Sequence, residues 1–142
     1  MFRLLEITFA HDKESQAIYP YETKDDLEGE YESKLGLAML NNSDSLLIGV
    51  DNLGQAIFLG KSGSHDFSPR LYEAKSITGQ EEAVDLAKYD DENTLHARYH
   101  TKKGAAIKNA NCTQENLLGF DGNGGQLEYC HWVRTDYSVM ME

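Results

Sequence analysis

Length, composition and charge narrow the class of protein. The chain has 142 residues, 40% of them hydrophobic and only two of them proline, which is typical of a folded domain rather than a disordered segment. With 24 acidic against 13 basic residues the net charge is −11, which argues against direct binding to DNA, RNA or an anionic membrane, because those contacts depend on clustered Lys and Arg.

The sequence also bears on where the protein resides. Arg3 and Glu6 interrupt the N-terminus before an apolar stretch can form, so we expect no secretory leader. No apolar window is long enough to span a bilayer. Cys112 and Cys130 lack the spacing of a metal site and the density of a disulfide scaffold. These features predict a cytoplasmic protein with reduced thiols.

Three elements are predicted in the first half of the chain. Residues Phe2–Phe9 have the partial alternation and the β-forming residues of a strand. A helix is expected to begin at Thr23, because Thr23 followed by Asp26 resembles a capping box with Asp in the Glu position. A hairpin then joins the apolar run Leu46–Val50 to Ala56–Leu59 through a turn that contains glycine.

The second half repeats this order after a turn-rich connector at residues 62–68. A strand is predicted over Arg70–Ile77, and a helix follows with apolar residues at helical spacing. A hairpin then joins Leu117–Phe120 to Leu127–Val133. The turn at Asp121–Gly125 superficially resembles a calcium loop, but it lacks the required glycine and glutamate, so we interpret it as a hairpin turn.

A direct alignment indicates that the two halves are copies. Tyr21–Asn41 aligns with Tyr89–Asn109 without a gap, and seven of the twenty-one positions are identical. Further matches place Arg3–Glu6 over Arg70–Glu73, upstream of this block, and continue into the hairpins downstream. Three collinear blocks predict an internal duplication. The identical pairs are Tyr21/Tyr89, Leu27/Leu95, Tyr31/Tyr99, Lys34/Lys102, Gly36/Gly104, Ala38/Ala106 and Asn41/Asn109.

We therefore predict an α+β fold made of a tandem β-α-β-β unit. The two units are expected to share one mixed or antiparallel sheet of about six strands, with pseudo-twofold symmetry and two helices packed on one face. The chain would form a single domain over residues 1–142. Its parts would be a first repeat at 1–61, the connector at 62–68, a second repeat at 69–135 and a C-terminal tail at 136–142.

Two pairs of repeated residues invite a structural explanation. Lys34 and Lys102 fall near the sheet-facing side of their helices, where each either extends its ammonium to water or forms a salt bridge to the repeated Glu6 or Glu73. Gly36 and Gly104 lie in small-residue strips opposite the apolar stripes. They either allow close helix–helix packing or mark the ends of their helices.

The strands of the hairpins suggest an interface. Leu46–Val50 and Leu117–Phe120 are continuous apolar runs, which is typical of strands covered on both faces. Two helices cover only one face of a sheet. The other face would need curling of the sheet, cover from residues 17–19 and 86–87, or a second molecule, and a homodimer through this second sheet face is the simplest arrangement.

Acidic residues cluster at equivalent places in the two repeats. Acids at a helix N-terminus are stabilising, but these clusters exceed what capping requires. Two such patches could contact a basic protein, or imitate a nucleic acid in a basic groove. The residues of the predicted patches are Asp25, Asp26, Glu28, Glu30, Glu32, Glu81, Glu82, Asp85, Asp90, Asp91 and Glu92.

One constellation could hold a metal. His96 and His100 are four residues apart on the second predicted helix, and the aligned residues of the first are Glu28 and Glu32. These four side chains would converge if the helices packed side by side. The simpler interpretation is a solvated pair of polar positions on each helix.

No catalytic motif is found, so the sequence suggests no catalytic residue and no cofactor. Cys112 and His131 could be a nucleophile and a base, but nothing orients them. We expect a non-enzymatic interaction or assembly protein, acidic and homodimeric, that binds itself and a basic partner, with mimicry of a nucleic acid as one variant. The alternatives are a phage or mobile-element structural subunit, and a metal-binding protein or enzyme with its site between the two helices.

Overall fold

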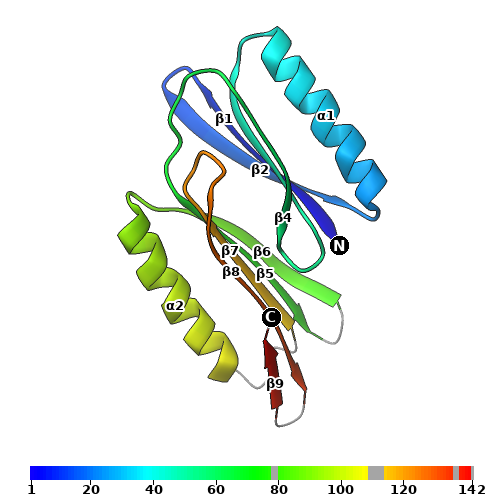
Figure 1. Ribbon diagram of the computed structural model, residues 1–142, viewed down its shortest axis with the longest axis vertical. Coiled ribbons are helices and arrows are strands. Elements are labelled where there is room, and N and C mark those ends of the chain that lie inside the picture. Colours follow the sequence, from blue (N-terminus) through cyan, green and yellow to red (C-terminus); the bar gives the residue numbers. More distant parts are fainter. Residues whose placement is uncertain (78–79, 109–113, 136–137, 142) are drawn as a thin grey trace. The chain divides into compact units, whose positions relative to one another are not determined.

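A computed structural model describes residues 1–77, 80–108, 114–135 and 138–141, and within them all side chains except those of residues 77, 80–83, 107, 132–135 and 138–141. The chain divides into two compact units (Figure 1). The first comprises Met1–Phe67 with Gly122–Gly124, and the second comprises Ser68–Asp121 with Gly125–Glu142. The division after Phe67 falls within the predicted connector.

The first unit is an antiparallel sheet with one helix on one face. Its sheet has four strands in the order β2-β1-β3-β4. The helix starts where the sequence predicts: Thr23 is the N-cap, and its hydroxyl accepts a hydrogen bond of 3.1 Å from the Asp26 N–H. The elements are β1 (Phe2–Ala10), β2 (Lys13–Tyr21), α1 (Lys24–Leu40), β3 (Asp44–Val50) and β4 (Ala56–Ser62).

The second unit has the same order of elements and one further strand. Its sheet is antiparallel in the order β6-β5-β7-β8-β9, and α2 lies along one face of it (Figure 1). Asp91 takes the capping role that Thr23 has in the first unit, because its carboxylate accepts a hydrogen bond of 2.7 Å from the Thr94 N–H. The elements are β5 (Arg70–Ile77), β6 (Gln80–Lys88), α2 (Glu92–Lys108), β7 (Gln114–Phe120), β8 (Gln126–Thr135) and β9 (Ser138–Met141).

The α+β fold with two helices is confirmed, and several details of the prediction are corrected. The first unit is ββαββ and the second is ββαββ followed by β9, rather than β-α-β-β, because β2 and β6 are strands that the sequence did not reveal. The strands form two sheets, of four and five strands, in place of one sheet of about six. The predicted tail contains β9. Both helices continue past Gly36 and Gly104, so these glycines do not end them.

The duplication extends to the register of the strands. Arg3 lies opposite Val50 in the β1–β3 ladder, and the aligned Arg70 lies opposite Phe120 in the β5–β7 ladder. Each unit also has a register shift after an aligned glycine, between Gly49 and Val50 in one and between Gly119 and Phe120 in the other. A one-residue slip would turn every side chain to the opposite face, so the shared register places aligned residues in equivalent positions.

The core of each unit lies between the helix and its sheet. In the first unit Leu4, Leu27 and Leu47 are buried together, each with no exposed surface. In the second unit the cluster contains Leu71, Tyr99 and Leu117, together with Ala106 and Cys130. The apolar spacing on both helices therefore marks the face that packs on the sheet.

Candidate functional site

The acidic residues of α1 lie at its exposed side. Asp25, Asp26, Glu30 and Glu32 are exposed, and Glu28 is half-buried. Asp25 and Asp26 are in the first helical turn, where the helix dipole favours negative charge. The sequence prediction of an acidic surface on the first helix is therefore consistent with their exposure, while the role of that surface stays a prediction.

The second acidic cluster is distributed differently. Asp85 is exposed on β6, Asp90 lies before α2, and Glu92 is in the first turn of α2. Asp91 is the N-cap, and hydrogen bonds from the N–H and hydroxyl of Thr94 hold the pKa of its carboxyl below the ordinary value. Capping accounts for this residue. The side chains of Glu81 and Glu82 lie outside the described ones.

The outer face of α1 combines these acids with apolar side chains that the sequence analysis did not single out. Met39 and Leu40 are 61% and 81% exposed, and Leu37 on the flank is 59% exposed. Residues seven apart lie on the same side of a helix, so Asp25, Glu32 and Met39 form one row. We call the exposed set Asp25, Gly29, Glu32, Gly36, Met39 and Leu40 the α1 outer face.

The same face of α2 has a different chemistry. Asn93 and His100 stand where the first unit has Asp25 and Glu32, and Lys108 stands where it has Leu40. The acids Asp25 and Glu32 and the apolar Leu40 of the α1 outer face are thus not repeated at the aligned positions of α2.

The two candidate metal-binding histidines face a carboxylate of their own unit. His96 Nδ1 lies 2.5 Å from Glu128 Oε1 on β8, and His100 Nε2 lies 3.9 Å from the same oxygen. Glu28 and Glu32 are on α1 of the first unit. Within the described side chains, no group of three or more His, Cys, Asp or Glu residues is arranged to hold a metal ion. The proposed four-residue site stays a prediction.

The residues considered as a nucleophile and a base are only partly described. Cys112 lies outside the described residues. His131 is buried and hydrogen-bonded through Nδ1 to the side-chain oxygen of Asn116. Cys130 is a buried free thiol, and burial raises its pKa. A raised pKa disfavours the reactive thiolate, so Cys130 has the character of a core residue.

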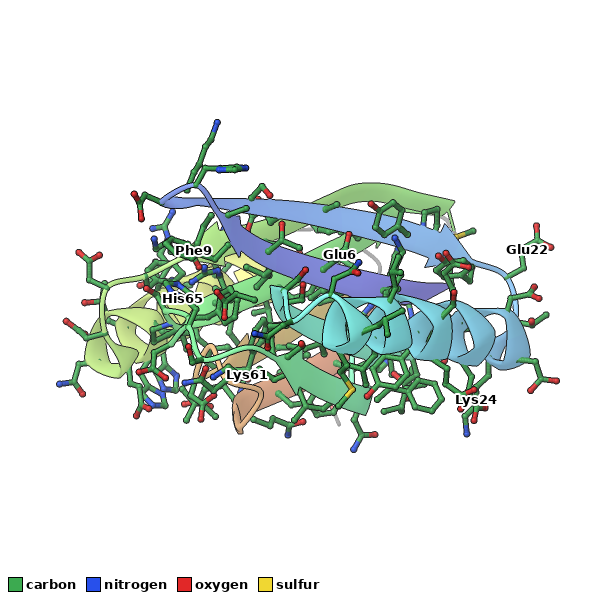
Figure 2. The ribbon with its side chains drawn as sticks, turned by 90° about the horizontal axis from the view of Figure 1, so that it is seen from above. Glu6, Phe9, Glu22, Lys24, Lys61 and His65 are labelled. Carbon is green, nitrogen blue, oxygen red and sulfur yellow. The ribbon has the colours of Figure 1, made fainter. Side chains whose placement is uncertain are left out.

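Each unit has a pocket between its helix and the two central strands, and the two pockets lie at aligned positions. The pocket of the first unit has a volume of about 280 Å³ and contains Glu6, Lys34, Leu37 and Ser45. Figure 2 shows Glu6 on β1 beside α1, with Phe9 near the far end of that strand. The ion pair between Lys34 Nζ and Glu6 Oε2 is 3.7 Å long.

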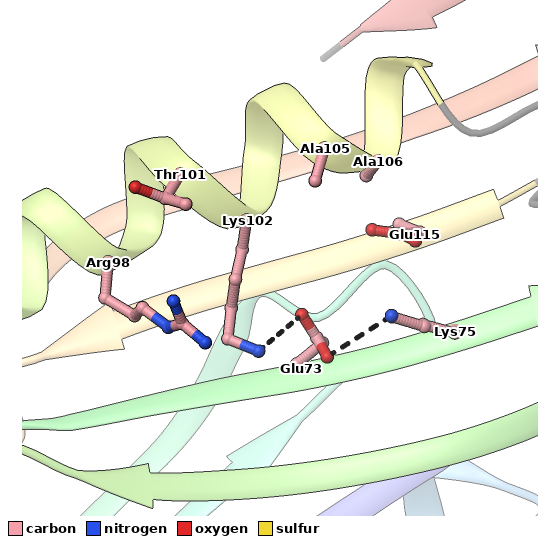
Figure 3. A pocket seen from close by; sticks show the side chains of 8 residues that line it. All are labelled: Glu73, Lys75, Arg98, Thr101, Lys102, Ala105, Ala106 and Glu115. Atoms are coloured by element: carbon pink, nitrogen blue, oxygen red, sulfur yellow. Dashed lines mark ion pairs between the residues drawn. The ribbon is translucent and has the colours of Figure 1, made fainter.

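The pocket of the second unit, about 250 Å³, is more highly charged (Figure 3). Lys102 Nζ lies 3.4 Å from Glu73 Oε2, which repeats the Lys34–Glu6 pair. Of the two interpretations that the sequence left open for these lysines, the salt bridge is the one found in both units. The residues around this pocket are Glu73, Lys75, Arg98, Thr101, Lys102, Ala105, Ala106 and Glu115.

Comparisons of the chain with protein-family models, with curated proteins and with solved structures found no match. Among the helices of the described residues, none has the length and apolar character needed to cross a membrane.

Proposed function

We propose that this is a non-enzymatic protein-binding protein, and that the α1 outer face is its contact surface. The observation that carries the proposal is the exposure of Met39 and Leu40, at 61% and 81%, on a helix that also exposes four acidic residues, Asp25, Asp26, Glu30 and Glu32. Large apolar side chains near the centre of an interface supply much of its binding energy, whereas peripheral charges mainly provide orientation and rate.

The glycines of this face support the proposal. A Cβ added to Gly29 or to Gly36 would have no neighbouring atom within 4 Å. Glycine inside an exposed helix costs about 1 kcal/mol relative to alanine, so two of them weaken α1 without a benefit to its own packing. A partner backbone that approaches closely over these positions gives a reason for both.

The chemistry of the surface defines the partner. Acids occupy the N-terminal half of the face, and the apolar side chains occupy its C-terminal end. The complementary partner is a segment with Lys or Arg at one end and apolar residues at the other, such as a basic amphipathic helix. Charge complementarity would make its binding salt-sensitive.

A titration with a defined peptide tests this. Isotope-labelled protein is titrated with a synthetic amphipathic helix that has lysines in one half and leucines in the other, and backbone amide shifts are followed by NMR. We expect saturable shifts confined to α1 that weaken as salt is added. Absence of saturation, or shifts confined to the second unit, would contradict the proposal.

Matched variants separate specific from general charge effects. Asp25→Lys with Glu32→Lys should abolish binding, whereas Asp90→Lys with Glu92→Lys makes the same change in net charge at exposed positions of the second unit and should leave it unchanged. Leu40→Ser should weaken binding about tenfold or more, if this side chain is a central contact. Equal losses of peptide binding in both charge-reversed variants would show that binding depends on the net charge of the protein and not on the α1 outer face.

The predicted homodimer needs a separate measurement. Light scattering after size-exclusion chromatography at tens of micromolar distinguishes a monomer from a dimer. If a dimer forms through the α1 outer face, we expect Leu40→Ser to weaken it. A dimer that Leu40→Ser leaves unchanged would instead agree with the predicted contact through the second sheet face.

A further inference from the structure

The pocket under α2 differs from its counterpart under α1 in a way that indicates a ligand. Glu73 and Glu115, whose residues as a whole are 8% and 1% exposed, line this pocket. Figure 3 shows Arg98 and Lys102 reaching from α2 toward the strand that carries Glu73. The pocket lies within the second unit, so this inference does not depend on the proposed function of α1.

The charges of the pocket are not balanced. The Glu73 carboxylate lies 3.8 Å from Lys75 Nζ and 3.4 Å from Lys102 Nζ, so one acid serves two ammonium groups. Arg98 adds a third cation, and no ion pair of Arg98 is found among the described side chains. Among the residues that line the pocket, the cations Lys75, Arg98 and Lys102 outnumber the acids Glu73 and Glu115, so the lining favours a bound anion.

The duplication provides an internal control. Both pockets contain the helix lysine and the strand glutamate, so this shared pair belongs to the fold. Where the second unit has Lys75, Arg98 and Glu115, the first has Thr8, Glu30 and Ser45 at the aligned positions. The first unit folds without these three charges.

The buried position of Glu115 is an energetically unfavourable place for a charged side chain. Taking a carboxylate such as that of Glu115 out of water is unfavourable unless it is compensated by bonds and opposite charges. The serine at the same place in the first unit avoids that cost. The first unit has the same arrangement of helix and central strands without the charges of Lys75, Arg98 and Glu115, so we attribute these charges to a role beyond the fold.

We propose that this pocket binds a small carboxylate that also carries an amino or hydroxyl group. The planar guanidinium of Arg98 matches a carboxylate through two parallel hydrogen bonds, with Lys102 beside it as a second positive charge. Glu115 accepts a hydrogen bond from the amino or hydroxyl group. Ala105 and Ala106 leave room for only a small carbon chain in about 250 Å³. A doubly charged phosphate would bring more negative charge beside Glu73 and Glu115 than a singly charged carboxylate does.

The test is an NMR titration of the full-length labelled protein with glycine, serine, lactate, acetate and inorganic phosphate as separate probes. We expect saturable amide shifts around residues 98–106 and 73–75, with glycine, serine or lactate binding more tightly than acetate or phosphate. No saturation with any carboxylate up to tens of millimolar overturns the proposal. Phosphate binding more tightly than the carboxylates overturns the ligand class.

The matched variants replace a residue of the second unit by the residue at the aligned position of the first unit. Arg98→Glu introduces the residue found at the aligned position, and because Arg98 is exposed the fold should be kept. We expect about a tenfold or greater loss of carboxylate affinity. Glu30→Arg in the first unit is the control and should leave that affinity unchanged. Unchanged carboxylate binding in Arg98→Glu would show that Arg98 does not bind the carboxylate and would overturn the proposal.

Glu115→Ser tests the second contact with a readout that a purely structural role would not change. If Glu115 accepts from the amino or hydroxyl group, this variant binds acetate at least as well as before and loses its preference for glycine or lactate over acetate. If the preference persists while the thermal midpoint falls, Glu115 serves the fold alone and this part of the proposal is wrong.

Discussion

Tyr99 on α2 is hydrogen-bonded to Cys130 on β8, and Tyr31 occupies the same place in the first unit. A Cβ added to Gly60, which aligns with Cys130, would lie 2.6 Å from the hydroxyl oxygen of Tyr31. Burial raises the pKa of both tyrosines. The repeated tyrosines therefore have related surroundings, as an internal duplication requires.

This contact predicts a protected thiol. Burial raises the pKa of Cys130, so the reactive thiolate is disfavoured in the folded protein. In a Cys112→Ser background we expect Cys130 to react with a thiol reagent at neutral pH only as urea unfolds the chain, which absorbance measures directly. Reaction as fast in the native protein as in the unfolded chain would refute the burial of this residue.

The open space around the helix glycines predicts that alanine stabilises the protein. A Cβ at Gly36 or Gly104 would have no atom within 4 Å beyond the local helix. Gly36→Ala and Gly104→Ala should each raise the free energy of unfolding by about 0.5–1 kcal/mol, measured by urea denaturation. Gly60→Ala is the control and should be destabilising, because its Cβ would lie 2.6 Å from Leu35 Cδ2.

The glycine variants also bear on the α1 outer face. If a partner approaches over Gly36, Gly36→Ala raises stability and weakens peptide binding, while Gly104→Ala raises stability alone. A loss of stability in either variant would indicate that the helix packs closely against something at that position.

The two repeated ion pairs should differ in their contribution to stability. The Glu73 side chain is 11% exposed and that of Glu6 is 21% exposed, so removing the lysine leaves a more deeply buried charge in the second unit. We expect Lys102→Met to lower the free energy of unfolding by about 1–2 kcal/mol and Lys34→Met by less than about 1 kcal/mol. Adding Glu73→Gln to Lys102→Met should restore part of the lost free energy of unfolding. A larger decrease for Lys34→Met than for Lys102→Met would contradict this explanation.

The capping carboxylate of Asp91 predicts how the stability of the folded protein depends on pH. Its pKa is below the ordinary 3.8 in the folded state, so its charge stabilises the protein above that pH and the stabilisation is lost as the pH falls through the folded-state pKa. The thermal midpoint of Asp91→Asn should be lower than that of the native protein at neutral pH, and the difference should disappear in strong acid. Thr23→Ala removes an uncharged cap, so the decrease that it causes in the thermal midpoint should not change as the Asp91 carboxylate becomes protonated.

The repeat made much of the architecture predictable from sequence. Thr23 marks the start of α1, and the aligned lysines and glutamates form the expected pairs. The turns are also repeated: Asp51 N–H donates to the Gln55 carbonyl and Asp121 N–H to the Gly125 carbonyl, each at 2.9 Å. Such features depend on local sequence, which the alignment compares directly.

The edge strands were missed for a physical reason. β2 begins with polar residues and contains Pro20, and β6 contains several acids. Among the described strands, β2 pairs with β1 alone and β6 with β5 alone. Proline and charge are tolerated at a sheet edge, where they discourage pairing with other chains, but they hide the apolar alternation of a strand. The segments around residues 17–19 and 86–87 therefore resembled approaches to a helix. With each edge strand unrecognised, the strands appeared to form one shared sheet.

The candidate sites were predictable only in part. The acids of α1 form a cluster that is visible in the sequence. The exposure of Met39 and Leu40 is known only from the structure, in which the helix directs them away from the sheet. The charged pocket required Lys75 and Glu115, which are forty residues apart, to be opposite each other in the β5–β7 ladder. Pairing between distant strands is a tertiary feature that single-sequence patterns do not carry.

The order of strands has a consequence for the folding kinetics of each unit. In the first, the β1–β2 hairpin closes between neighbours such as Ala10 and Lys13, whereas the central ladder joins Arg3 to Val50 across the whole helix. Closing the longer loop costs more chain entropy, so the hairpins should form early and the middle of the sheet should seal last. Amides of the central ladder would then gain protection after those of the hairpins in pulse-labelled hydrogen exchange.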